Sequence, residues 1–136
     1  MIRSVQIDGY RGLSHFEMSG LGRINLIVGK NNSRKTSVLE ALHLLSSAGD
    51  VQALWQICGR RGERLSEIRD ARFGQPEIDI AHLFTGHEIQ LNSKFTLRAK
   101  NEPNERMLTF VVRETKENER SPAPPATELP SRYPRV

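Results

Sequence analysis

The stretch Gly29-Lys30-Asn31-Asn32-Ser33-Arg34-Lys35-Thr36 decides how this chain folds. An apolar run that contains β-branched residues, residues 24–28, precedes it, and a helical pattern follows it. The stretch has the first glycine, the lysine and the threonine of the phosphate-binding pattern G-x-x-x-x-G-K-[ST], with Arg34 in place of the second glycine. A strand, this loop and a helix in that order are the context in which such a loop binds a polyphosphate.

The residue types of the loop predict a nucleotide site. In such a loop the backbone N–H groups and the positive end of the helix dipole surround the phosphates. Lys35 would reach the β- and γ-phosphates, Thr36 would offer its hydroxyl to Mg²⁺ as the metal ligand, and Ser37 would add an α-phosphate contact. The predicted nucleotide-binding residues of this segment are Gly29, Lys30, Asn31, Asn32, Ser33, Arg34, Lys35, Thr36 and Ser37.

A polar turn that ends in a helix cap is the alternative interpretation. That turn gives no reason for a Lys-Thr pair, because a cation at a helix start opposes the dipole by about 0.3–1 kcal/mol. Arg34 weakens the nucleotide prediction: if its position requires φ > 0, a residue with a Cβ is strained there by about 1–2 kcal/mol. Its guanidinium would in turn attract phosphate. The sequence leaves this balance open.

Three segments carry a resemblance to a known family. Residues 2–13 form a strand pattern and a turn with Tyr10 and Arg11, Asn31 occupies the asparagine position of G-x-N-x-S-G-K, and residues 35–42 read Lys-Thr-Ser-Val-Leu-Glu-Ala-Leu. These segments resemble the amino-terminal lobe of ABC-type and AAA-type ATPase heads of RecF-like, SMC-like and OLD-family proteins. Residues 60–63 and 82–89 resemble the AAA-type subset more loosely.

The resemblance implies an α/β fold, a P-loop NTPase-like lobe. Its parts would be a mixed sheet with amino-terminal strands, a Walker A loop and helix, and a peripheral antiparallel hairpin. It implies ATP and Mg²⁺ as cofactors, and it makes Arg11 a candidate nucleotide contact, with a solvated turn arginine as the alternative. Complete heads also carry a signature motif, a Walker B strand and a switch histidine, but no run of four apolar residues followed by Asp-Glu occurs here.

We therefore expect a truncated ATPase lobe that binds ATP weakly, hydrolyses it slowly or not at all, and needs a carboxy-terminal lobe or a second head. A non-catalytic DNA-binding or interaction module with a degenerate loop is the alternative function, and a remnant without activity is the third. The net charge of +4 and the arginines favour an acidic partner such as DNA, although a solvated helix–loop face accounts for them as well. These arginines are Arg60, Arg61, Arg64, Arg69 and Arg72, and the solvated face is the favoured interpretation because no aromatic residues alternate with them and no known DNA-reading motif occurs.

The remaining sequence patterns predict the secondary structure and the cellular compartment. Residues 2–8, 15–18 and 23–28 predict three strands, the last of them buried, and helices are predicted after Thr36 and after Asp50, with a short one near residues 65–68. Residues 89–100 and 107–113 predict a hairpin, so that residues 1–113 form the lobe and residues 114–136 a disordered proline-rich tail. The single cysteine fits a reducing cytoplasm, and no stretch is long enough to span a membrane.

Overall fold

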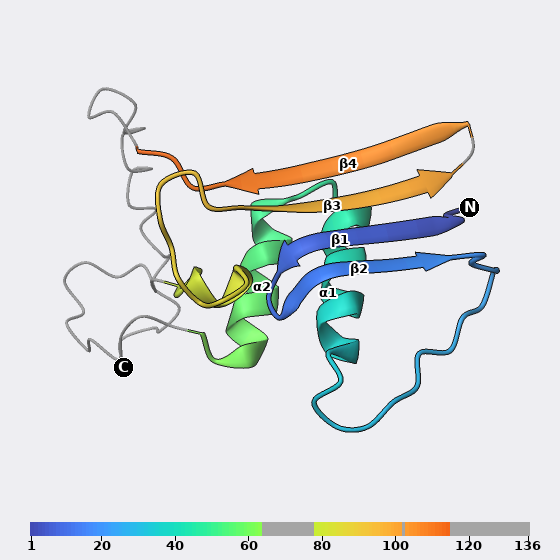
Figure 1. Ribbon diagram of the computed structural model, residues 1–136, viewed down its shortest axis with the longest axis horizontal. Coiled ribbons are helices and arrows are strands. Elements are labelled where there is room, and N and C mark those ends of the chain that lie inside the picture. The colour runs from blue at the N-terminus through green and yellow to red at the C-terminus, as the bar shows by residue number, and fades with distance from the viewer. Residues whose placement is uncertain (64–77, 102, 115–136) are drawn as a thin grey trace, which may run out of the picture.

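The computed structural model describes residues 1–63, 78–101 and 103–114. Four strands in the described residues form one antiparallel sheet in the order β2-β1-β3-β4 (Figure 1). The strands are β1 (Ser4–Tyr10), β2 (Leu13–Ser19), β3 (Lys94–Asn101) and β4 (Asn104–Val111). The helices are α1 (Lys35–Ser46) and α2 (Val51–Arg61), and a 3₁₀ turn covers Ala81–Leu83.

Two hairpins build the sheet. A tight turn joins β1 to β2, which pair from Ser4 opposite Ser19 to Tyr10 opposite Leu13. The second hairpin joins β3 to β4, and β3 pairs with β1 in the middle of the sheet. Alternation along β1 and β3 sends their apolar side chains to one face, as a half-buried sheet requires. The predicted hairpin of residues 89–100 and 107–113 is confirmed by the pairing of β3 with β4, and the strands predicted at residues 2–8 and 15–18 are confirmed as β1 and β2.

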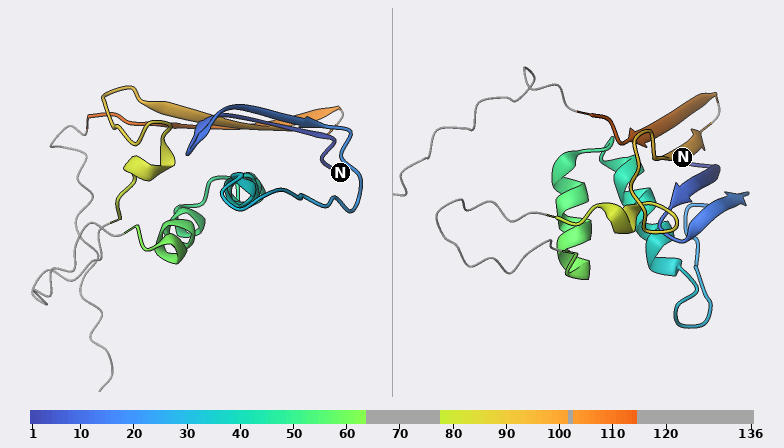
Figure 2. Two further views of the ribbon diagram at one scale, coloured as in Figure 1. Left: turned by 60° about the horizontal axis from the view of Figure 1, so that its bottom comes forward. Right: turned by 60° about the vertical axis from the view of Figure 1, so that its left-hand side comes forward.

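Both helices lie on this apolar face of the sheet (Figure 2). Helix α1 contacts β1, β3 and β4, and α2 packs against α1. Asp50 accepts a hydrogen bond from the backbone N–H of Gln52 at 3.1 Å and so caps α2, as its sequence predicts. The core includes Tyr10, Leu44, Ile57, Phe95 and Leu97, each at most 2 % exposed. This packing fixes α1, and therefore the residues at its start, against the sheet.

The predicted buried strand at residues 23–28 is wrong. This segment pairs with no strand among the described residues, and Ile24, Leu26 and Val28 are 94 %, 87 % and 76 % exposed. Ile27 alone packs partly against the core. The physical reason is that a strand forms only beside a partner strand, and its own side-chain pattern cannot supply one.

The predicted mixed sheet with a peripheral hairpin also needs correction. The described sheet is antiparallel throughout, and β3 is one of its two central strands rather than part of a peripheral unit. Both predicted long helices are confirmed, at Lys35–Ser46 and Val51–Arg61. The predicted short helix near residues 65–68 lies outside the described residues, as does the tail from residue 115. In the part of the chain that the structure describes, no helix has the length and apolar character to span a membrane.

Candidate functional site

The loop before α1 closes around the side chain of Lys35. Its Nζ donates hydrogen bonds to the carbonyl oxygens of Gly29 at 2.7 Å and Lys30 at 2.6 Å, and to Ser33 Oγ at 3.1 Å. The backbone N–H of Ser33 donates to Lys30 O at 3.3 Å across the same loop. The ammonium group therefore holds the two ends of the loop together at the start of the helix.

The amino terminus of α1 has no neutralising partner among the described residues. Its N-cap residue, Arg34, makes no side-chain cap hydrogen bond, and no acidic residue occupies the first helical turn. The first backbone N–H groups of a helix have no acceptor within the helix, so they are satisfied by a cap, by water or by a bound anion. An anion at this point would meet both those donors and the positive end of the helix dipole.

Arg34 adopts the left-handed conformation that its place in the motif suggests. Its φ is +62° and its ψ is +18°, in the region that glycine occupies without steric cost. Its side chain turns toward the β1–β2 turn, where a Cβ built on Gly12 would lie 2.2 Å from Arg34 Nε. The backbone therefore has the positive φ on which the predicted strain depends. Because Gly12 has no side chain, it leaves space that the Arg34 guanidinium occupies.

A hollow of about 400 Å³ opens beside the loop. Its lining consists of Asn31, Asn32, Ser33, Arg34, Lys35, Thr36, Ser37 and Arg61. The lining contains three cationic side chains and no carboxylate. Gly29 and Lys30 contribute carbonyl oxygens to Lys35 rather than surface to the hollow. This charge distribution is suited to an anion.

Thr36 is the residue predicted to bind Mg²⁺. Its side chain is exposed and lines the hollow, whereas Ser37 is 5 % exposed. Among the described residues, no group of three or more His, Cys, Asp and Glu side chains could hold a metal ion. Mg²⁺ in nucleotide sites takes one or two protein oxygens and otherwise phosphate and water oxygens. One hydroxyl at the edge of a phosphate site fits that chemistry.

Arg11, the other predicted nucleotide contact, lies in a buried ion-pair cluster and does not line the hollow. Its Nε lies 2.9 Å from Glu40 Oε2, and its Nη1 and Nη2 donate to the two carboxylate oxygens of Glu63 at 2.5 and 3.0 Å. The second oxygen of Glu40 lies 2.7 Å from Arg61 Nε. The cluster therefore connects the β1–β2 turn, α1 and the end of α2.

The surroundings of this cluster shift three pKa values. Burial would lower the pKa of the Arg11 guanidinium, but the hydrogen bonds to Glu63 and the neighbouring charges outweigh it and raise that pKa. Burial also raises the pKa of the Tyr10 hydroxyl, while Arg11 opposes that rise. Burial, with the nearby Glu63 charge, raises the pKa of the Cys58 thiol to about 11. Arg11 therefore stays charged and Cys58 stays a thiol at neutral pH.

Sequence reasoning missed Arg61 as a residue of the loop site. The sequence grouped it with four other arginines as a basic cluster, yet it alone of these lines the hollow in the described residues. A signal was present in the helix pattern. Ala53, Ile57 and Arg61 follow one another at intervals of four, so Arg61 continues the buried face of α2.

Comparisons with known proteins give the class, an amino-terminal lobe of AAA and RecF-like P-loop ATPases. The family model described as AAA ATPase domain matches residues 1–123. The chain therefore belongs to the AAA ATPase domain family.

Curated relatives support the same relation. An uncharacterized protein of Methanocaldococcus jannaschii is 48 % identical over 97 residues, which are 70 % of this chain and 42 % of that protein. The DNA replication and repair protein RecF of a Marinomonas species is 52 % identical over 42 residues, 31 % of this chain and 11 % of RecF. An ATP/GTP phosphatase of Helicobacter pylori is 38 % identical over 45 residues, 33 % of this chain and 12 % of that protein. The chain thus spans less than half of the length of each of these relatives.

Proposed function

We propose that this chain binds Mg²⁺-ATP at residues 29–37 as the amino-terminal lobe of an ATPase head. One observation carries the proposal: Lys35 Nζ is held over the loop by the carbonyl oxygens of Gly29 and Lys30, beside an uncapped helix start. A phosphate chain would replace those carbonyl oxygens as acceptors while the helix N–H groups donate to it. Thr36 would give its hydroxyl to Mg²⁺. The predicted contact from Arg11 stays a prediction, because its donors already serve Glu40 and Glu63.

The lobe alone would bind ATP without efficient hydrolysis. Phosphoryl transfer depends on groups that hold Mg²⁺, position the nucleophile and stabilise the developing charge. The loop offers the Lys35 ammonium and the Thr36 hydroxyl to the phosphates and Mg²⁺, and the carboxylates of Glu40 and Glu63 are paired with arginines. A carboxy-terminal lobe or a second head would supply the acidic groups that this reaction needs.

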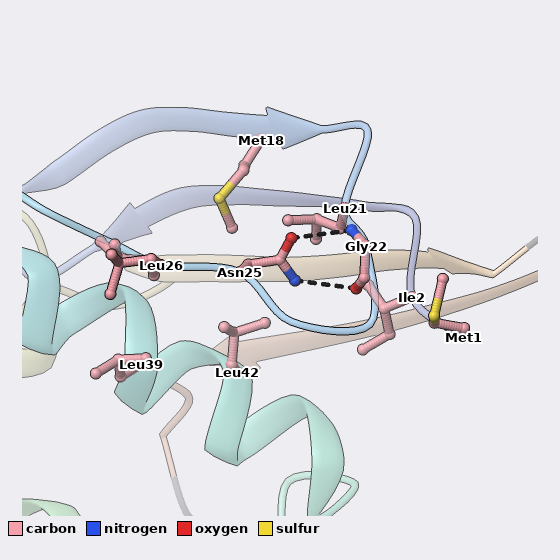
Figure 3. A pocket seen from close by; sticks show the side chains of 10 residues that line it. Met1, Ile2, Met18, Leu21, Gly22, Asn25, Leu26, Leu39 and Leu42 are labelled. Atoms are coloured by element: carbon pink, nitrogen blue, oxygen red, sulfur yellow. Dashed lines mark hydrogen bonds between the residues drawn. The ribbon is translucent and has the colours of Figure 1, made fainter.

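The exposed segment at residues 23–28 supports the need for such a lobe. Its apolar side chains at Ile24, Leu26 and Val28 face solvent, and its backbone pairs with no strand of the described sheet. Beside it lies a largely apolar hollow of about 530 Å³ between β2 and α1 (Figure 3). Leu26, Leu39 and Leu42 point into this hollow. Strands of the carboxy-terminal lobe would pair with the segment and cover these side chains.

Hydrogen exchange tests this pairing. In the isolated chain, the amide protons of residues 24–28 should exchange as fast as those of an unfolded peptide, because strand pairing does not protect them. When the chain is joined to the carboxy-terminal lobe of a RecF-type head, the same amides should become protected, while those of β1 stay protected in both samples. Unchanged exchange in the joined protein would contradict the pairing.

Titration with a fluorescent ATP analogue tests the proposed function itself. The purified chain should give a saturable signal that is stronger with Mg²⁺ than with a chelator and that unlabelled ATP displaces. A signal that neither saturates nor responds to unlabelled ATP would remove the proposal.

Substituting Arg34 by glycine should tighten ATP binding about tenfold. The backbone already has φ +62° without a ligand, so the strain of about 1–2 kcal/mol that glycine removes adds to stability, and the tighter binding comes from closer approach of the backbone to a phosphate. A tenfold change corresponds to about 1.4 kcal/mol. His87→Gly is the matched control: its φ is +59°, but it lies outside the loop and does not line the hollow, so the affinity should change less than twofold. Unchanged or weaker ATP binding by Arg34→Gly would contradict this prediction. It would show that the Arg34 guanidinium contributes at least as much to ATP affinity as the closer backbone approach that glycine allows.

DNA binding is the second candidate function. The RecF relatives are named for DNA replication and repair, and this chain carries a net charge of +4. Nonspecific DNA binding falls steeply with salt because released counterions drive it. Strong, salt-dependent binding to duplex DNA that Lys35→Ala leaves unchanged, together with no ATP binding, would favour a DNA-binding module that retains an inactive loop.

A further inference from the structure

Arg61 is the last residue of α2, and it reaches the loop from a different element. Its guanidinium lines the hollow together with Asn31–Ser37, and its Nη2 lies 3.5 Å from Ser37 Oγ. The side chain is 34 % exposed, so it faces both the protein and the hollow. The cationic lining of the hollow consists of Arg34, Lys35 and Arg61. Two of these three come from the loop and the start of α1, and only Arg61 comes from α2.

The orientation of Arg61 is set by Glu40. One carboxylate oxygen of Glu40 accepts from Arg61 Nε at 2.7 Å, and the other lies 2.9 Å from Arg11 Nε. Arg11 is in turn bonded to Glu63 just beyond the end of α2. The Glu40 pair uses the Nε of Arg61, and the Nη2 of the same guanidinium remains directed at Ser37 and the loop. A planar guanidinium held in this way has donors left for a phosphate.

We propose that Arg61 is a phosphate-binding residue of this nucleotide site, supplied by α2 and oriented by Glu40. The inference rests on the proposed function, because it needs a nucleotide at residues 29–37. Arg61 would donate through its Nη groups to a phosphate in the hollow, next to Ser37. The fork of a guanidinium suits phosphate oxygens in a way that an ammonium does not. An ion pair with Glu40 and nothing more is the competing role, and in that role Arg61 would not contribute to ATP affinity.

The test compares three variants of the full chain. Arg61→Gln should weaken fluorescent ATP binding about tenfold, and Arg61→Lys, which keeps the charge without the fork, should weaken it about threefold. Arg60→Gln is the matched control, since Arg60 has the same charge one residue away and does not line the hollow beside the loop. Its affinity should stay within twofold of the wild type. Thermal melts of all variants establish that each is folded.

A phosphate-only competitor separates a direct contact from a structural role. Tripolyphosphate should displace the analogue from the wild-type chain, and Arg61→Gln should lose about the same factor of affinity for tripolyphosphate as for ATP. A loss for ATP with unchanged tripolyphosphate affinity would overturn the inference, because the side chain would then act on the base or on the fold.

Different results would contradict the proposed nucleotide site and the proposed role of Arg61. If the wild-type chain binds no ATP, or if Lys35→Ala binds it equally well, the nucleotide site itself fails and the Arg61 inference fails with it. If Lys35→Ala loses binding while Arg61→Gln and Arg61→Lys stay within twofold of the wild type, the site stands and the Arg61 inference alone is wrong.

Discussion

Substituting Arg11 by methionine is expected to lower the free energy of unfolding by about 3–5 kcal/mol. The side chains of Arg11, Glu40 and Glu63 are only 6 %, 12 % and 10 % exposed. Methionine fills similar space but leaves Glu63 buried without its bidentate partner. Removing one member of a buried pair costs far more than the pair itself contributes, because the remaining charge has lost its water and its counter-ion. Urea denaturation of the wild type and the variant measures the difference.

Two further variants show whether the lower free energy of unfolding comes from the ion-pair cluster. Arg11→Met combined with Glu63→Gln should recover much of the stability, since the second substitution removes the uncompensated charge. Arg98→Met is the exposed control. Arg98 lies 3.2 Å from Glu105 in a pair whose side chains are 36 % and 47 % exposed, so its loss should cost less than about 1 kcal/mol. A double variant no more stable than Arg11→Met, or an Arg11 loss as small as that of Arg98, would contradict a structural role for the cluster.

The features that the sequence predicts correctly are those that local interactions determine. The apolar spacing after Thr36 depends on the helix alone, and α1 forms at Lys35–Ser46. Asp50 caps α2 because its side chain needs only the N–H group two residues away. Alternation and a breaker-rich turn predict the β3–β4 hairpin, whose strands are neighbours in the chain. The condition stated for Arg34, a φ above 0°, also depends on the local loop backbone, and the observed φ of +62° meets it.

The errors concern contacts between distant residues. Residues 23–28 have the composition of a buried strand, but burial depends on a neighbour that the described sheet does not provide. The resemblance makes Arg11 a candidate nucleotide contact, which stays a prediction, but nothing in the sequence identifies its ion-pair partners Glu40 and Glu63, which lie 29 and 52 positions along the chain. Spacing puts Arg61 on the same face of α2 as Ala53 and Ile57, but only the packing of α2 on α1 brings this arginine to the loop. Pairing of this kind cannot be read from spacing within one element.

The ion-pair cluster and the loop are parts of one arrangement. Glu40 lies one helical turn after Thr36 on α1, and it holds Arg61 from α2 and Arg11 from the β1–β2 turn. The same turn contributes Gly12, against which the Arg34 side chain lies. Three elements therefore fix the surroundings of residues 29–37 before a ligand is present. A preformed site binds with less ordering cost than a loop that must fold around its ligand.

Lys35→Ala is expected to weaken Mg²⁺-ATP binding about 100-fold, which corresponds to about 2.7 kcal/mol. The loss combines two effects. The ammonium group that would bind the phosphates is removed, and charge-assisted hydrogen bonds of this kind contribute about 1.5–3 kcal/mol. The loop also loses the donor that joins Gly29 O, Lys30 O and Ser33 Oγ. Because the loop is exposed, the free energy of unfolding should change by less than about 1 kcal/mol, so affinity and stability separate in this variant.

The matched control for Lys35 is Lys30→Ala, which removes the same charge from the same loop. The Lys30 carbonyl accepts from Lys35 Nζ, but its own side chain does not line the hollow. If binding reflects general attraction to a basic surface, the two variants should lose affinity equally, and the loss should shrink as salt is added. If residues 29–37 hold the phosphates as proposed, Lys30→Ala should stay within about threefold of the wild type while Lys35→Ala loses binding. Fluorescence titrations at two ionic strengths decide between these outcomes. Only a specific phosphate site would make the affinity depend on which lysine is removed rather than on the loss of one positive charge.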